Sequence, residues 1–260
     1  MKKQLRRIYQ LLLPVCDPLQ VIRGIYNYPW YIGSWRRYVR MPGAEALRAA
    51  NAFPQVHDRT ATTGVDAHYF YNTGWAMRRI LAESPAQHID IGSHNTFVNL
   101  LSSVLPVTFV DYRPLEVCMD GLTNKAGDIL NLPFDDGSVE SLSCLHVAEH
   151  IGLGRYGDPL NPNGTQEACA ELSRVLSPGG NLFFALPVGK QRVCFNAHRI
   201  HAAETVVEYF KELELVEFSG VHDDGKYVER VSLDEFKDSD YACGLFWFKC
   251  KSGKKGRQID

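Results

Sequence analysis

The chain has 260 residues, 45% of them hydrophobic and 22% charged, a composition typical of a soluble globular protein with one or two domains. Its seven cysteines include no CxxC pair, which argues against a disulfide framework and a zinc ribbon. Because no signal peptide is recognisable, we expect reduced thiols and a cytoplasmic protein.

The first 40 residues differ from the rest in charge. They carry +7, which leaves −9 on the remainder of a chain whose net charge is −2. The basic residues are Lys2, Lys3, Arg6, Arg7, Arg23, Arg36, Arg37 and Arg40. Proline and glycine breaks within residues 1–60 predict short helices and loops. We therefore expect a basic, aromatic, helical extension over residues 1–60 that packs on the main domain. The alternative is a peripheral contact with an anionic membrane, at the inner face, or with an anionic acceptor.

Residues 61–260 are predicted to form one α/β domain. Helical patterns cover 66–82, 95–105, 164–176 and 203–213, and strand patterns cover 87–91, 107–111, 138–146, 181–186, 215–219 and 242–250. This alternation predicts a mostly parallel sheet with helices on both faces. The last two strands have no helix between them, so we expect an antiparallel hairpin at the edge of the sheet.

Polar side chains fall at the ends of these predicted strands, where ligands bind in open parallel sheets. The first strand runs through Asp90 to Gly92, a residue that allows a tight turn and a close backbone approach. Asp111 ends the second strand and can accept both ribose hydroxyls of a nucleotide. Asp128 can accept from an adenine amine while the ring lies on Ile129. The order and spacing of these residues predict a nucleoside site.

Four segments together resemble the class I S-adenosylmethionine-dependent methyltransferases. They are DIGS, VDYRP, GDILNLPFDDGSVESLSCLHVAEHI and ELSRVLSPGGNLFFALP, within a resemblance that runs from about residue 66 to residue 250. The resemblance implies a Rossmann-like, seven-stranded, mostly parallel sheet with an antiparallel last strand, and S-adenosylmethionine as the cofactor. It implies that Asp90 and Gly92 lie near the methionine part of the cofactor, Asp111 at the ribose, Asp128 and Ile129 at the adenine, and His146 beside the sulfonium.

One segment departs from the family, and another narrows the resemblance. The turn Gly92-Ser93-His94-Asn95-Thr96 lacks the glycine run that is usual in the family. One interpretation is that Ser93, His94 or Asn95 supplies polar contacts to the cofactor instead. The other is that cofactor binding has been lost. The segment HVAEHIGLGRYGDPLNPNG resembles a bacterial branch associated with cell-surface polysaccharide loci. That branch implies a sugar or polysaccharide-related acceptor.

The segment after the fourth strand holds the candidate catalytic residues. His150 has an ordinary pKa near ~6.5, which suits a general base at neutral pH. Glu149 or Asp158 could orient it, and Arg155 could bind an anionic or hydroxyl-rich acceptor. Tyr156 belongs to the same polar, glycine-rich loop. The Glu149-His150 pair can instead be structural and bond to neighbouring backbone.

Two further residues, His198 and Arg199, are candidates for acceptor binding, with helix-capping or surface contacts as the alternative. The remaining single histidines lack metal-ligand spacing, so no metal site is predicted; they are His57, His68, His88, His201 and His222.

Three functions are consistent with these patterns. The first is O-methylation of a small-molecule or glycan acceptor. The second is a non-catalytic, methyltransferase-like binding module in surface-polysaccharide assembly, which the single-glycine turn favours. The third is a nicotinamide-dependent oxidoreductase, against which the absence of GxGxxG argues. No nucleic-acid partner is expected, because residues beyond 40 are acidic overall.

Overall fold

The computed structural model describes residue 9 and residues 11–251. Two compact units divide the chain, one spanning Met1–Gly64 and the other Val65–Asp260. Four of the basic residues noted above, Lys2, Lys3, Arg6 and Arg7, lie outside the described residues.

The described part of the first unit contains one long helix, α2 (Pro18–Tyr38), and a 3-10 turn, η1 (Ala49–Asn51). The expectation of only short helices was wrong, because α2 runs for 21 residues and includes Pro29. Asp17 caps α2 by accepting from two backbone N–H groups of the first turn. No residue of α2 is buried, so water can bond the carbonyl that Pro29 leaves without a donor. Within the described residues, no helix is both long and apolar enough to span a bilayer.

Eight strands form one sheet in the described part of the second unit, in the order β3-β2-β1-β4-β5-β10-β8-β9. They are β1 (His88–Ile91), β2 (Val107–Asp111), β3 (Leu122–Ala126), β4 (Val139–Leu145), β5 (Leu176–Val188), β8 (Leu213–Val221), β9 (Tyr227–Val228) and β10 (Ala242–Cys250). Strands β1 to β5 are mutually parallel where they pair, and β10 is antiparallel to both β5 and β8, as predicted for the last strand. The predicted hairpin corresponds to β8 and β10, and β10 lies inside the sheet rather than at its edge.

The predicted count of seven strands was wrong by one. The additional strand is β9, a two-residue segment that pairs with the end of β8 at the edge of the sheet. At the opposite edge, β3 was not predicted from the sequence pattern, because its residues, LTNKA, are half-buried or exposed and include only two apolar side chains. The two edges of the sheet are thus the parts that hydrophobic periodicity did not reveal.

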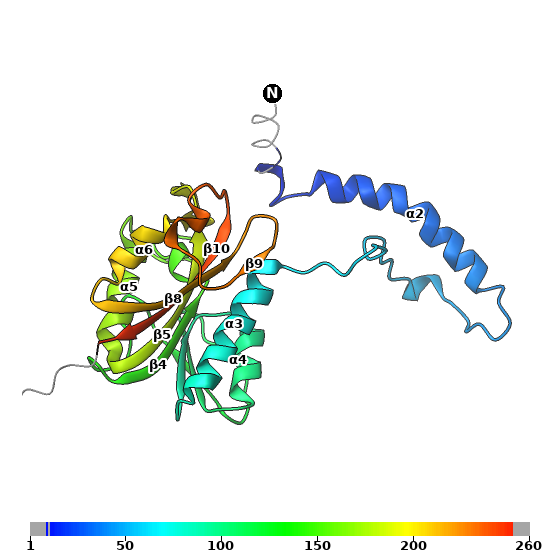
Figure 1. The fold of residues 1–260 in the computed structure, drawn as a ribbon. Helices are drawn as coiled ribbons and strands as arrows, with labels where there is room; N and C mark the ends of the chain where they lie inside the picture. Colours follow the sequence, from blue (N-terminus) through cyan, green and yellow to red (C-terminus); the bar gives the residue numbers. More distant parts are fainter. Residues whose placement is uncertain (1–8, 10, 252–260) are drawn as a thin grey trace, which may run out of the picture. The chain divides into compact units, whose positions relative to one another are not determined.

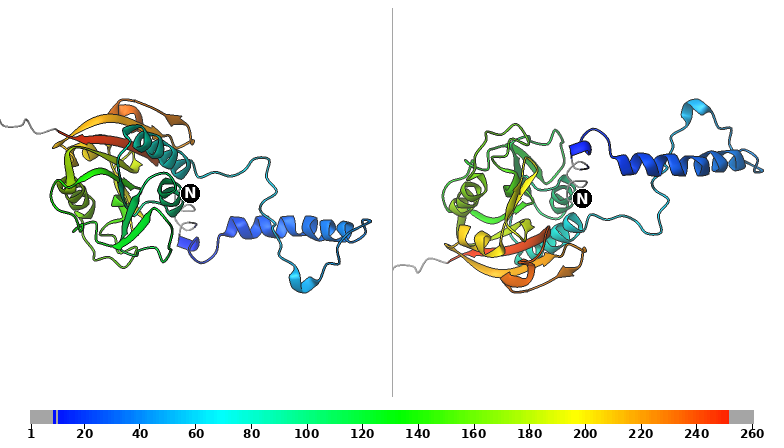
Figure 2. Two further views of the ribbon diagram at one scale, coloured as in Figure 1. Left: turned by 90° about the horizontal axis from the view of Figure 1, so that it is seen from below. Right: turned by 90° about the horizontal axis from the view of Figure 1, so that it is seen from above.

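Helices cover both faces of the sheet (Figures 1 and 2). Helices α3 (Ala67–Glu83) and α4 (Asn95–Ser102) pack on one face, around a core that includes Trp75. Helices α5 (Gly164–Val175) and α6 (Ala203–Tyr209) pack on the other, around a core that includes Phe184. The shorter elements are η2 (Ala148–His150), η3 (Leu233–Phe236) and a separate two-stranded sheet of β6 (Arg192–Cys194) and β7 (His198–Ile200).

Sheet register aligns the carboxyl ends of the strands that carry the candidate residues. Ile91 of β1 pairs with Val110 of β2, and Asp111 pairs with Ala126 of β3. Because paired parallel strands end at the same edge, the segments that follow β1, β2, β3 and β4 converge there. The candidate site is built from these four segments.

Candidate functional site

A pocket of about 210 Å³ lies at this edge of the sheet. Its wall follows the four strand ends in turn and is completed by the loop after η2. Eight of the fourteen predicted site residues line it: Gly92, Asp111, Asp128, Ile129, His146, His150, Tyr156 and Asp158. The other six are not among the lining residues: Asp90, Ser93, Glu149, Arg155, His198 and Arg199.

The turn after β1 brings Gly92 against Asp111 of the neighbouring strand. Gly92 has a φ of 66°, and a Cβ there would lie 3.2 Å from Asp111 Oδ2 and 3.2 Å from a Val147 methyl group. The other carboxylate oxygen, Oδ1, accepts from the Arg113 backbone N–H at 2.7 Å. The Asp111 carboxylate is therefore held at one oxygen, and its second oxygen faces the glycine turn. A ligand can approach the backbone of this turn only because residue 92 has no side chain.

The segment after β3 adds an acid next to an apolar surface. Gly127 packs so closely on β2 that a Cβ there would lie 2.5 Å from a Val110 methyl group. Asp128 is exposed, and its Oδ1 accepts from the Leu130 N–H at 2.9 Å. The neighbouring Ile129 is buried but forms part of the pocket wall. In this part of the pocket, the Asp128 carboxylate can accept a hydrogen bond from an amine. A flat ring that carries the amine can lie on the apolar side chain of Ile129.

Asp90 and Ser93 lie beneath the pocket and hold the glycine turn in place. Asp90 is fully buried; it accepts from the Ser93 N–H at 3.0 Å and from the Ser143 hydroxyl. Ser93 Oγ accepts in turn from the Leu145 N–H at 3.0 Å, which ties the turn to β4. Burial raises the pKa of Asp90 to about 6, although its hydrogen bonds oppose this shift. Both residues thus position the backbone instead of facing the pocket.

His146 follows β4 and has an unusual backbone conformation, with a φ of 59°. Its Nδ1 lies 2.9 Å from Glu149 Oε1, and its Nε2 lies 3.2 Å from the Cys243 sulfur. Burial opposes a charge on this imidazole, but the Cys243 sulfur and the Glu149 carboxylate raise its pKa well above the ordinary value. Glu149 is almost fully buried and does not line the pocket, so it orients His146.

His150 lines the pocket with one ring nitrogen engaged and the other without a hydrogen bond. Its Nδ1 lies 2.6 Å from the Ala197 carbonyl oxygen, a distance at which Nδ1 carries the proton and donates. Its Nε2 is then an acceptor; the nearest ionic partner, Glu149 Oε1, is 3.7 Å away. Burial lowers the pKa of His150 despite the nearby Glu149 carboxylate, so the imidazole is neutral at pH 7. A neutral imidazole with a free Nε2 is the form that a general base requires.

The loop after η2 is held by Asp158. Its carboxylate accepts from the N–H groups of Gly152 at 2.7 Å and Tyr156 at 3.2 Å, and from Gly154 at 3.4 Å. Burial opposes ionisation, but these backbone donors lower the pKa of Asp158. Arg155 donates to the Ala197 carbonyl at 3.0 Å, beside the His150 contact. These contacts position the loop against His150.

The two predicted acceptor-binding residues have different surroundings. The His198 ring packs against that of Tyr241 at a tilt of 34°, with ring centroids 4.9 Å apart. Arg199 is only 7% exposed and donates to the carbonyl oxygens of Ile151 at 2.5 Å and Asn161 at 2.9 Å. Because its donors are engaged by backbone, Arg199 fixes the loop rather than facing the pocket.

The pocket residues that were not predicted from the sequence include Tyr112 and Arg113, which directly follow Asp111. The Arg113 guanidinium lies 4.4 Å from the ring centroid of Tyr156, within cation–π range. The segment after β2 therefore contacts the loop after η2 across the pocket. Their position in the sequence could have indicated a place in the pocket, because both residues immediately follow the strand-end acid Asp111. The contact with Tyr156 could not be predicted in this way, because Tyr156 lies 43 residues beyond Arg113.

Comparison with known families gives one match. Residues 136–240 match a family described as Caenorhabditis protein of unknown function, DUF268. The match covers less than half of the chain and includes the loop after η2. No curated protein sequence matches the chain.

Solved structures with the same fold are numerous, at low sequence identity. N-methyltransferase NodS from Bradyrhizobium japonicum, in complex with S-adenosyl-L-homocysteine, is 19% identical, with 68% of this chain and 85% of that chain covered and a TM-score of 0.50. The 1,6-didemethyltoxoflavin-N1-methyltransferase of Burkholderia thailandensis is 13% identical, with 70% and 79% covered and a TM-score of 0.50. The cyclase SpnF is 14% identical, with 70% and 80% covered and a TM-score of 0.52. The second unit thus has the class I methyltransferase fold, which also supports a cyclase.

Proposed function

We propose that the chain binds S-adenosylmethionine in the pocket at the strand ends and transfers its methyl group to an acceptor. The contact between Gly92 and Asp111 carries this proposal. A close-approach glycine and a half-engaged carboxylate at two adjacent strand ends form a cradle that a Cβ would fill. Asp111 would accept from the ribose hydroxyls, and Asp128 and Ile129 would contact the adenine.

His150 is the residue proposed to act on the acceptor. When bound, S-adenosylmethionine supplies an electrophilic methyl group, so the chain must hold the acceptor in line and remove its proton. The Ala197 carbonyl keeps the proton of the neutral imidazole on Nδ1, which leaves Nε2 to accept the proton of an acceptor hydroxyl. Tyr156 and Asp158 would form the side of the pocket that contacts the acceptor.

The acceptor is proposed to be a hydroxyl of a sugar or a polysaccharide-related molecule. Support comes from the resemblance of residues 146–164 to the bacterial branch found at surface-polysaccharide loci. Polar atoms of this loop, including those of Asn161 and Asp158, line the pocket and suit a hydroxyl-rich ligand. The fold neighbours act on varied substrates and do not bear on the choice of acceptor.

Calorimetric titration with S-adenosylmethionine, S-adenosylhomocysteine and NAD tests the proposal. We expect both methyl-cycle compounds to bind and NAD not to bind. Binding of NAD alone would favour an oxidoreductase. A folded protein that binds none of the three would be the non-catalytic module that the single-glycine turn also permits. Binding without turnover on a panel of sugar acceptors would retain the cofactor assignment and contradict the acceptor.

A membrane contact of the first unit is a separate proposal. Helix α2 has no buried residue and ends with Arg36 and Arg37 in its last turn, while Ile22 and Ile25 are 63% and 70% exposed. Exposed apolar and basic side chains on one helix suit an anionic interface. Sedimentation with anionic vesicles should show binding that salt weakens, and no binding at low salt would contradict the proposal.

A further inference from the structure

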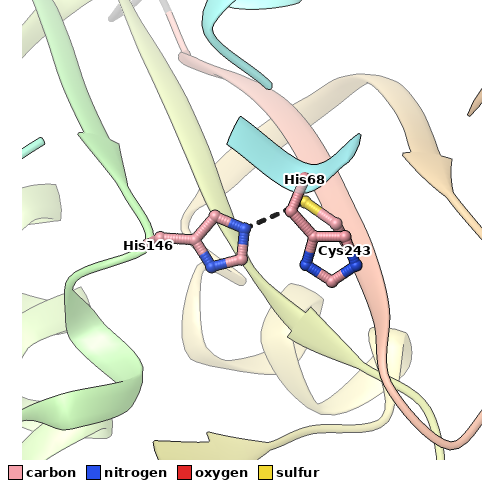
Figure 3. Close-up of side chains that lie close together, drawn as sticks. All are labelled: His68, His146 and Cys243. Atoms are coloured by element: carbon pink, nitrogen blue, oxygen red, sulfur yellow. Dashed lines mark hydrogen bonds between the residues drawn. The ribbon is translucent and has the colours of Figure 1, made fainter. Parts of the chain in front are cut away.

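A cluster of potential metal ligands forms behind the His146 wall of the pocket. His68, His146 and Cys243 each offer one ligand atom, and these atoms all lie within 4.8 Å of one another. Figure 3 shows the three side chains, which come from the first turn of α3, the end of β4 and the start of β10. Among the described residues, no other group of three or more histidine, cysteine or acidic side chains has this arrangement.

The topology of the sheet explains why these distant residues meet. Strand β10 runs antiparallel to β5, so its first residues lie at the edge where the parallel strands end. Cys243 pairs with Pro187 near the end of β5, and His146 donates its backbone N–H to Ala185 at 2.8 Å. His146 and Cys243 therefore sit on strands that flank β5, at neighbouring levels.

We propose that these three side chains bind a transition-metal ion of the Zn²⁺ class. Two imidazole nitrogens and one thiolate are preferred Zn²⁺ ligands, and three protein ligands leave a fourth position open. In a tetrahedral Zn²⁺ site, bond lengths of roughly 2.0 Å to nitrogen and 2.3 Å to sulfur place the nitrogen and sulfur atoms roughly 3.5 Å apart. The His146 Nε2 to Cys243 Sγ distance of 3.2 Å is close to that edge length.

Glu149 supplies the second feature of such a site. Its Oε1 lies 2.9 Å from His146 Nδ1, on the side of the ring opposite the sulfur. A carboxylate that accepts from the outer N–H of a histidine ligand fixes the tautomer and makes the inner nitrogen a better donor to metal. Glu149 is 1% exposed and its Oε2 has no hydrogen-bond partner. Within the described part of the chain, the side chains that face this buried carboxylate are those of His146 and His150.

His68 completes the donor set from the helix. Its ring stacks on that of His146, with the two ring centroids 5.5 Å apart. The side chain is only half-buried, which leaves it free to adjust toward an ion.

Cobalt titration of chelator-treated protein tests the site directly. Co²⁺ bound to a thiolate gives charge-transfer absorption in the near ultraviolet, and tetrahedral Co²⁺ gives intense visible bands. We expect both signals at one Co²⁺ per chain, and their loss on addition of Zn²⁺. Cys243→Ser should abolish the near-ultraviolet band, whereas Cys169→Ala, which removes a buried thiol on α5, should retain it.

Two further variants keep the test decisive if Cys243→Ser does not fold. His68→Ala changes a half-buried side chain and should remove the visible bands of tetrahedral Co²⁺. Glu149→Gln should retain the spectrum but weaken Co²⁺ binding by roughly 10- to 100-fold. A folded wild-type protein without a near-ultraviolet band, or a band that survives in Cys243→Ser, would overturn the proposal. Because no S-adenosylmethionine is added, this outcome is independent of the proposed function.

Discussion

The two halves of the pocket are built in different ways. The half proposed to hold the nucleoside, here called the nucleoside half, consists of strand ends and the glycine turn, whose positions follow from the register of β1, β2 and β3. The half proposed to hold the acceptor, here called the acceptor half, consists of the loop after η2, which is held by Asp158 and Arg199 through hydrogen bonds to backbone. Substitutions in the first half should therefore affect cofactor affinity. Substitutions in the second should affect turnover or loop stability.

Replacement of His150 should give the largest effect and separate the halves most clearly. We expect His150→Asn to lower kcat by roughly 100- to 10,000-fold, the range for loss of a general base. Affinity for S-adenosylhomocysteine should remain within about twofold, because the nucleoside half is unchanged. Single-turnover kinetics and calorimetry measure the two quantities. An unchanged kcat would show that the Glu149-His150 pair is structural.

Replacement of Arg199 should destabilise the acceptor half of the pocket, because Arg199 holds the loop after η2 in place. Arg199→Met leaves the carbonyl oxygens of the half-buried residues Ile151 and Asn161 without their donor. We expect the free energy of unfolding to fall by roughly 2–4 kcal/mol, the scale for loss of several charge-assisted hydrogen bonds. Urea denaturation measures this change, and Arg192→Met, at an exposed residue of β6, is the control. Equal midpoints for the two variants would contradict the supporting role.

The sequence was informative where local rules determine position. Asp111 ends β2 as predicted, and the helix predicted from residue 66 is present as α3, which Asp66 caps by accepting from the Tyr69 N–H. The pairing of β8 with β10 also followed from the lack of a helix between them, although β9 did not. Strand-end placement, a helix cap and a hairpin each depend on a few adjacent residues, so a single sequence can reveal them.

The same sequence did not reveal contacts between distant segments. His150 is oriented by the carbonyl of Ala197, 47 residues away, and Cys243 lies 97 residues beyond His146. The absence of metal-ligand spacing around His68 was a sound observation about the sequence, but the antiparallel β10 brings Cys243 to the same edge. Such contacts depend on topology, which spacing along the chain does not encode.

The buried layer beneath the nucleoside half predicts a smaller, pH-dependent effect. His88 bonds Ser141 and Ser143, and burial lowers its pKa from 6.5 to about 3. The unfolded chain therefore binds a proton at His88 below pH 6.5 that the folded chain does not, so this histidine destabilises the fold as the pH falls. The contribution is at most about 1.4 kcal/mol per pH unit.

We expect His88→Asn to lose less stability than the wild type between pH 6.5 and pH 4.5. Asp90, with its pKa raised to about 6, acts in the opposite direction and is present in both proteins. Chemical denaturation at several pH values measures the slope, and the exposed His57→Asn is the control. Parallel slopes for wild type and His88→Asn would contradict the burial effect.

The central claim is that the strand ends around Gly92 and Asp111 hold the nucleoside of S-adenosylmethionine. Calorimetric titration of Asp111→Asn with S-adenosylhomocysteine tests it most directly, with Asp135→Asn, at an exposed acid outside the pocket wall, as the matched control. We expect the Asp111 variant to bind roughly 10- to 100-fold more weakly than the wild type, the effect of a lost charge-assisted hydrogen bond. The control should bind as the wild type does. Equal affinity in all three proteins, or no binding to the folded wild type, would contradict the claim.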